Sequence, residues 1–155
     1  MRHYLQLFLI PALLAAFLVS CGFNTSPTYT DSDLIGRWQA PSESDIDPDG
    51  NYQYCVFLAE KDSTGEYRYG YMWDMGDHSD WDDSEGSYED FMLTEDFHGN
   101  GWFKWKLSSS KLVEFHFMSG GWSDVPKSYT ITVLTATTLT YQDDFKKQHS
   151  WTRVR

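Results

Sequence analysis

The sequence predicts an all-β domain in which short antiparallel strands close into an up-and-down barrel of eight or nine strands. Three observations support this prediction: apolar and polar residues alternate in segment after segment, aromatic residues make up 17% of the chain, and the connections are short. Period-two alternation with aromatic and β-branched residues is typical of strands that pack on one face. A long meander either closes or leaves two exposed edges, so a barrel is favoured over the alternative, a two-sheet sandwich.

The predicted strands follow one another at short intervals along the second part of the chain. They are residues 34–39, 52–60, 66–73, 103–107, 113–117, 128–133, 138–141 and 150–154, with a weaker candidate at 88–94. The connections at 61–65, 108–110 and 135–136 have the length of hairpin turns. After residue 33, no segment shows the 3.6-residue apolar period of an amphipathic helix.

The first twenty residues have the pattern of a secretory signal peptide, which is expected to be helical and to lie outside the fold. A basic start is followed by an apolar run over residues 5–19, which as a helix spans roughly 22 Å, less than the ~30 Å needed to cross a bilayer. The tetrapeptide Leu18-Val-Ser-Cys21 resembles the bacterial lipobox. This resemblance implies that Cys21 carries acyl chains such as palmitate. The chains would anchor the protein in the outer membrane, with the domain facing either the periplasm or the exterior. An ordinary signal peptide with an incidental cysteine is the alternative.

Residues 21–33 are expected to form a flexible tether between this anchor and a domain at residues 34–155, because they are polar and without a period. An acylated Cys21 would leave Cys55 without a disulfide partner. Cys55 lies in the apolar segment 52–58, with no neighbouring basic residue to activate it. It is therefore expected to be a buried and unreactive thiol.

Several short motifs follow in a fixed order along the predicted strands. They are Gly36-Arg-Trp38, Ser63 to Tyr67, Phe103-Lys-Trp105, Tyr129 to Leu134, Thr137 to Thr140 and Arg153-Val154. The Gly-x-Trp opening resembles that of the lipocalins, and the series is similar to small lipocalin-like domains of Gram-negative lipoproteins, over residues 34–155. Two features depart from that pattern, an altered turn at 61–65 and an enlarged loop at about 74–100.

The resemblance implies a barrel with one open end that takes a small apolar or amphipathic ligand. It also implies that Trp38 plugs the closed end and that the guanidinium of Arg153 lies across its ring. A cation above a desolvated indole contributes roughly 0.5–2 kcal/mol. The resemblance does not establish a cavity, because side chains alone can fill a barrel of this size.

The charge distribution argues against nucleic acid as a partner, because 23 acidic residues outnumber 12 lysines and arginines. Ten of the acids fall between Asp74 and Asp96, where there is no lysine or arginine. We call residues 74–100 the acidic loop and expect it to lie in solvent, since unpaired carboxylates are costly to bury. It has three interpretations: a solvated insertion, a docking surface for a basic protein, or a calcium site. The candidate calcium ligands are Asp77, Asp80, Asp82, Asp83 and Glu85.

Signatures of catalysis are absent from the sequence, so we expect a protein that is not an enzyme and uses no cofactor. There is no nucleophile elbow, no zinc-binding His-Glu-x-x-His and no phosphate-binding glycine loop. The histidines of the mature chain are scattered and are expected at the surface; they are His78, His98, His116 and His149. His116 and Glu114 are two residues apart on one strand face, which suits a surface pair as readily as an acid/base pair.

Aromatic residues are the positive signal for binding, because they are more numerous than one small core requires. The candidate ligand-binding residues are Trp73, Trp102, Trp105, Phe115, Phe117 and Trp122. Packing within the barrel is the competing interpretation for each of them. Residues 120–122 are expected in a mobile turn at the rim. Two alternatives to a ligand-holding barrel stay open: an interaction or inhibitor module that uses the acidic loop, and carbohydrate binding through exposed tryptophans.

Overall fold

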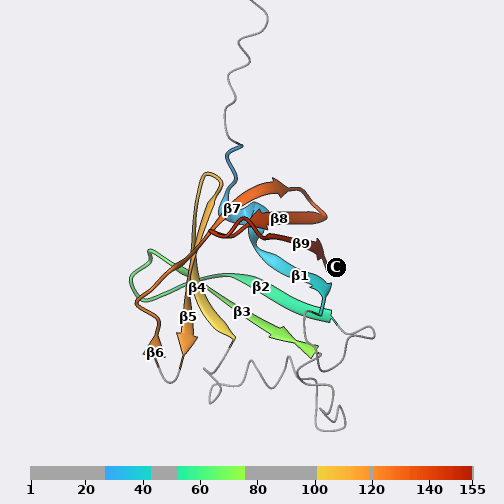
Figure 1. Cartoon of the computed structure of the whole chain (residues 1–155). Coiled ribbons are helices and arrows are strands. Elements are labelled where there is room, and N and C mark those ends of the chain that lie inside the picture. Colours follow the sequence, from blue (N-terminus) through green and yellow to red (C-terminus); the bar gives the residue numbers. More distant parts are fainter. Residues whose placement is uncertain (1–26, 43–51, 76–100, 119–120, 155) are drawn as a thin grey trace, which may run out of the picture.

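The computed structural model describes residues 27–42, 52–75, 101–118 and 121–154, and it confirms the all-β prediction (Figure 1). Within these ranges one short helix precedes a series of strands. They are α2 (Asp31–Leu34), β1 (Gly36–Pro41), β2 (Tyr52–Lys61), β3 (Arg68–Asp74), β4 (Trp102–Ser108), β5 (Lys111–Met118), β6 (Gly121–Trp122), β7 (Lys127–Leu134), β8 (Thr138–Gln142) and β9 (Gln148–Arg153).

Eight of the strands form a closed antiparallel barrel. Neighbours pair from β1 through β5, then β5 pairs with β7, β7 with β8 and β8 with β9. The ring closes where β9 returns to β1, through the pairs Trp38↔Arg153 and Gln39↔Thr152. β6 adds a ninth strand by pairing with the end of β5. A closed ring excludes the sandwich, which needs two separate sheets.

The predicted strands that fall within the described ranges are all found, with their ends shifted by at most two residues. The short strand β6 is the exception: Gly121 and Trp122 were expected in a mobile turn but pair with Met118 and Phe117. The weak candidate strand at 88–94, the signal peptide at 1–20 and most of the acidic loop lie outside the described residues.

Large side chains fill the inside of the barrel. The largest that are fully buried are Trp38, Phe57, Phe103, Trp105, Leu112, Ile131 and Leu139. Each contributes roughly 1.5–3 kcal/mol through burial. Packing is tight enough to require a glycine at position 70, since a Cβ there would lie 2.4 Å from the Phe103 ring and 2.7 Å from the Val56 carbonyl oxygen.

The closed end of the barrel brings Trp38 and Arg153 together, as the resemblance implied. The guanidinium carbon of Arg153 lies 4.1 Å from the centre of the Trp38 ring. Arg153 also donates hydrogen bonds to the carbonyl oxygens of Ile35 (2.7 Å) and Asp33 (2.5 Å), and Trp38 Nε1 donates to that of Leu34 (2.9 Å). Arg153 therefore fixes both the Trp38 ring at the closed end and the chain segment that leads into β1.

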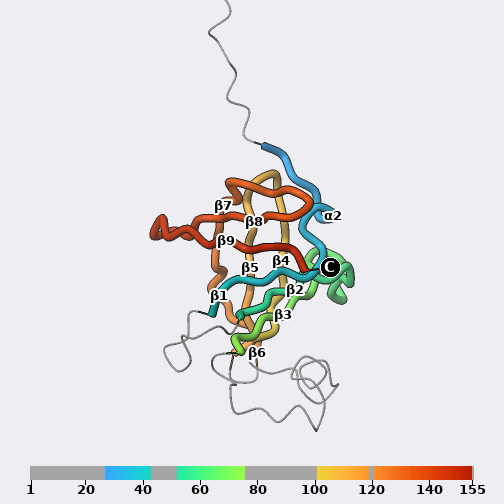
Figure 2. The backbone as a smooth tube through the Cα atoms, turned by 90° about the vertical axis from the view of Figure 1, so that its right-hand side faces the viewer, coloured from blue at the N-terminus to red at the C-terminus, as the bar shows by residue number. Residues whose placement is uncertain are grey.

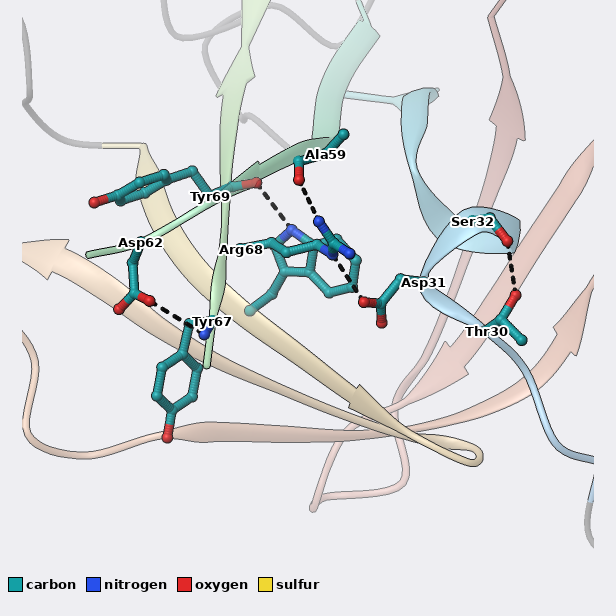
Figure 3. Close-up of polar contacts among 9 residues, drawn as sticks. Thr30, Asp31, Ser32, Ala59, Asp62, Tyr67, Arg68 and Tyr69 are labelled. Carbon is teal, nitrogen blue, oxygen red and sulfur yellow. Dashed lines mark hydrogen bonds and ion pairs between the residues drawn. The ribbon is translucent and has the colours of Figure 1, made fainter. Parts of the chain in front are cut away.

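Residues 27–33, expected to belong to the flexible tether, are packed on the barrel instead. The Tyr29 backbone nitrogen donates to the Ser109 carbonyl oxygen at 3.2 Å, in the turn between β4 and β5. Helix α2 is joined to β3 by an ion pair between Asp31 Oδ2 and Arg68 Nε at 2.8 Å (Figure 3). In Figure 2 the chain before α2 leads down onto the barrel and into this helix.

Candidate functional site

The exposed apolar side chains gather at one end of the barrel. We call it the open end: β1, β3, β5 and β8 finish there, and β2, β4, β7 and β9 begin there. Within the described ranges the large apolar residues that are most exposed are Tyr52, Met118, Val125, Val133 and Phe145. All except Val133 lie at the open end, and Phe145, at the tip of the β8–β9 turn, is 92% exposed. Exposed apolar groups concentrated in one place mark a contact or binding site.

A hollow of about 400 Å³ lies at this end, between the start of β7 and the β8–β9 turn. We call it the open-end hollow. Figure 2 shows that the β8–β9 turn projects away from the barrel. The lining of the hollow combines rings, charges and hydroxyls, from Pro126, Lys127, Ser128, Tyr129, Asp143, Asp144, Phe145 and His149. Its volume falls in the ~300–1,000 Å³ range of small-ligand sites.

A second hollow, of about 260 Å³, lies on the other side of His149, between the end of β1 and the start of β9. It exists because the two strands pair only at Trp38 and Gln39, so Ala40 and Pro41 diverge from β9. Trp151 lines this hollow and is 4% exposed.

The barrel interior also contains a hydrogen-bonded polar pair. Glu114 Oε2 and His116 Nε2 are 2.9 Å apart, and their side chains are only 5% and 12% exposed. The His116 ring stacks on the buried Phe103, with ring centres 5.6 Å apart. The expectation that Glu114 and His116 form a surface pair is therefore wrong, because the face of β5 that they share with Leu112 points into the core.

A row of rings leads from this pair to the open end. The Tyr129 and Tyr141 ring centres are 4.8 Å apart, those of Tyr141 and His149 are 5.2 Å apart, and His149 Nε2 lies 3.6 Å from Asp143 Oδ2. Burial, and then the Glu114 carboxylate, raise the pKa of both tyrosines above the ordinary value of 10.0. Both phenols consequently stay protonated and able to donate hydrogen bonds.

Cys55 faces the same interior and is buried, as expected. Burial is the main cause that raises the pKa of its thiol, and the Glu114 carboxylate adds to the effect. Because the thiolate is the nucleophilic form, this thiol is suited to packing rather than to chemistry.

Of the predicted ligand-binding residues, only Trp105 lies inside the barrel. It is fully buried, and its Nε1 donates to the Tyr69 carbonyl oxygen at 2.9 Å (Figure 3). The others lie on the outward face, where successive ring contacts link strands β2, β3, β4, β5 and β6. We call this surface the outer aromatic wall; its members are Tyr54, Trp73, Tyr71, Trp102, Tyr69, Trp122 and Phe117.

The alternation in β5 was assigned to the wrong face for a physical reason. Phe115 and Phe117 were expected to contact a ligand held in the barrel, whereas the buried residues of β5 are Leu112 and Glu114, on the other face. Alternation shows which residues share a face but does not show which face is inside. The outer surface is itself aromatic here, with Phe115 packed edge-on against Tyr67 at 5.4 Å between ring centres.

The described ranges contain no group of three or more His, Cys, Asp or Glu side chains arranged to hold a metal ion. The five candidate calcium ligands, Asp77 to Glu85, lie outside the described residues. In the part of the chain that the structure covers, no helix is long and apolar enough to cross a membrane.

Sequence reasoning missed the residues that build the open end: Tyr129, Tyr141, Asp143, Phe145, His149 and Trp151. The one signal available was a phenylalanine within the polar turn Asp143-Asp-Phe-Lys-Lys147, a position where an apolar side chain is unexpected. The approach of Tyr141 to His149 depends on the β8–β9 register, which the sequence does not show.

Comparison with known proteins found no match to a family model, to a curated protein or to a solved structure. The eight-stranded closed barrel is consistent with a calycin-like fold and is compatible with ligand binding.

Proposed function

We propose that this protein is a non-enzymatic binding protein of the cell envelope, anchored by acyl chains on Cys21, that holds a small amphipathic ligand at the open end of its barrel. The observation that carries the proposal is the open-end hollow of about 400 Å³, which the exposed Phe145 lines together with polar side chains. An exposed phenylalanine at the tip of a turn contributes little to folding, so its use is to be sought in contact with another molecule.

The lining of the hollow defines the chemistry of the ligand. Phe145 and Pro126 offer apolar surface to a hydrocarbon or ring portion, while Lys127, His149 and Asp143 offer hydrogen bonds to a polar group. Pockets of this kind draw affinity from apolar contact and orientation from a few polar groups. The interior beyond it is filled by packed side chains, so a ligand occupies the mouth of the barrel rather than its full length.

The proposed anchor also orients the barrel. Five residues lie between Cys21 and Pro27, and the six residue steps of a fully extended chain reach about 20 Å. Ser109, in the β4–β5 turn, donates from Oγ to the Pro27 carbonyl oxygen at 3.4 Å. This turn lies at the end of the β4–β5 hairpin opposite to β6 (Figure 1). The acylated end would therefore hold the closed end near the bilayer and leave the open end facing away from it.

Binding is tested with 1-anilinonaphthalene-8-sulfonate, an amphipathic dye that fluoresces in apolar sites. The expected result is saturable binding that weakens at least about tenfold in Phe145→Asp, because burial of the ring is lost. Val133→Asp makes the same chemical change at an exposed position away from the open end and is the matched control. Equal dye affinity in the two variants, with near-ultraviolet circular dichroism unchanged, would contradict the proposal.

The anchor is tested separately by labelling cells with radioactive palmitate. We expect label in the wild-type protein and in the membrane fraction, and loss of both in Cys21→Ser. If the mature protein is unlabelled and fractionates with the aqueous phase, the proposed anchor is wrong, whereas the proposed binding site is unaffected.

A further inference from the structure

A third hollow, of about 350 Å³, lies on the outside of the barrel and shares no residue with the open-end hollow. It is formed by the β2–β3 turn, β4, β5 and the residues after β6, and we call it the outer groove. Its lining residues are Asp62, Thr64, Tyr67, Lys104, Phe115, Trp122, Ser123 and Asp124. The groove thus continues the outer aromatic wall at its β6 end.

The aromatic rings of the outer groove are held in place before any ligand arrives. Tyr67 packs edge-on against Phe115. Trp122 packs edge-on against Phe117 at 5.2 Å between ring centres, and the Lys104 ammonium lies 4.7 Å from the Trp122 ring. Rings fixed by their neighbours lose little conformational entropy when a ligand binds, which favours affinity.

The polar groups of the groove are also fixed. Asp62 is buried beside it and accepts hydrogen bonds from the Thr64 hydroxyl (2.7 Å), the Tyr67 backbone nitrogen (3.3 Å; Figure 3) and Lys104 Nζ (3.3 Å). The first of these is the main cause that lowers the pKa of Asp62, so the carboxyl is ionised at neutral pH. Asp124 is exposed at the rim, next to the Ser123 hydroxyl. Carboxylates, hydroxyls and an ammonium therefore surround a set of rings.

This combination excludes two classes of ligand. A cationic ligand is disfavoured because Lys104 already lies over Trp122 and Lys106 lies 5.8 Å from the Tyr67 ring. A purely apolar ligand is disfavoured because it would desolvate Lys104 and Asp124 without replacing their hydrogen bonds to water. The ligand that fits presents an apolar face and a rim of hydroxyl groups together.

We propose that the outer groove binds a saccharide of one or two sugar units. A pyranose ring carries C–H groups on its face, which pack on a tryptophan or tyrosine ring, and hydroxyls at its edge, which donate to carboxylates and accept from an ammonium. Trp122 is the stacking platform, and Asp124 and Lys104 contact the hydroxyls. A binding protein with both sites would hold a glycan on its wall and a second ligand at its open end.

The test uses saturation-transfer NMR and titration calorimetry with maltose, cellobiose, N,N′-diacetylchitobiose and the disaccharide of bacterial cell walls. We expect at least one of them to bind with saturation strongest at the ring C–H protons. Trp122→Ala should weaken binding about tenfold, whereas Trp122→Phe, which keeps a ring, should weaken it less.

Two further variants guard against misfolding and against confusion with the open end. Asp124→Asn removes an exposed carboxylate without disturbing the packing and should weaken saccharide binding severalfold. Phe145→Asp should leave it unchanged, because Phe145 lines only the other hollow. The proposal would be overturned if none of the four disaccharides binds at about 20 mM, a concentration far above ordinary Kd values. It would also be overturned if Trp122→Ala and Asp124→Asn both bind the saccharide as tightly as the wild type.

Discussion

Glu114 and His116 form a pair inside the barrel, with Oε2 and Nε2 2.9 Å apart, on a strand whose other face carries Phe115 and Phe117 on the outside. The β3–β6 side of the barrel therefore carries aromatic rings on both faces, with Phe103 and Trp105 packed inside beside the polar pair and the outer aromatic wall and outer groove outside.

Breaking the internal pair should destabilise the fold. Glu114→Ala and His116→Ala each leave one buried polar group without its partner, which costs roughly 1–3 kcal/mol. Urea denaturation of the two single variants and of the double variant measures the effect, and we expect the double variant to lose less than the sum of the single losses. Additive losses would show that the two side chains do not depend on each other.

Arg153 should stabilise the closed end more than an ordinary surface cation does. Arg153→Lys keeps the charge but loses the planar group over Trp38 and the two-pronged hydrogen bonding to α2, so we expect a loss of about 1–3 kcal/mol. Lys61→Met, at an exposed position on β2, is the control and should change the free energy of unfolding by less than about 0.5 kcal/mol. If Arg153→Lys lowers the free energy of unfolding no more than the control does, Arg153 does not stabilise the closed end in this way.

Gly36 should tolerate no side chain, because its φ is +138° and a Cβ would lie 2.4 Å from Arg153 Nη1. Gly36→Ala is therefore expected to destabilise the protein by at least about 1 kcal/mol in thermal or urea unfolding. Gly65, which has nothing within 4 Å of a Cβ but also has a positive φ of +73°, separates the two causes. A smaller loss in Gly65→Ala than in Gly36→Ala would assign the difference to the contact with Arg153.

The protein should lose stability on the alkaline side. The pKa values of Tyr129, Tyr141 and Cys55 are raised in the folded state, so unfolding releases protons once the pH exceeds the ordinary values of 10.0 for tyrosine and 9.0 for cysteine. Stability from these groups is fully present below about pH 8 and falls as the pH rises towards their folded values. Urea unfolding at a series of pH values checks this. Tyr141→Phe should make the free energy of unfolding fall less steeply with pH between about pH 10 and 11, just above the ordinary pKa of tyrosine. An unchanged slope would contradict the conclusion that burial raises the pKa of Tyr141.

The barrel was predictable because each of its eight strands carries its own signal, whereas the two-residue β6 carries none. In β7, for example, Tyr129 and Ile131 alternate with threonine, and in β4 Phe103 and Trp105 alternate with lysine. Closure followed from the number of strands, and the contact of Trp38 with Arg153 followed from a resemblance. These features depend on local pattern and order, which a sequence records directly.

The candidate site was not predictable to the same degree because it depends on register and on the choice of face. The same alternation is compatible with Phe115 inside or Glu114 inside, and only the packing against Phe103 and Trp105 decides between them. Likewise, His149 reaches Tyr141 through pairing across the β8–β9 turn. Of the four tryptophans predicted to bind a ligand, Trp105 lies in the barrel and the other three lie on the outer aromatic wall.

Native mass spectrometry of the protein purified from its own host is the most direct test of ligand binding at the open end. We expect the wild-type protein and Val133→Asp to retain a small molecule that is lost on activation in the gas phase, and Phe145→Asp to lack it. The same adduct in all three proteins, or none in any of them, would contradict a ligand site at the open end.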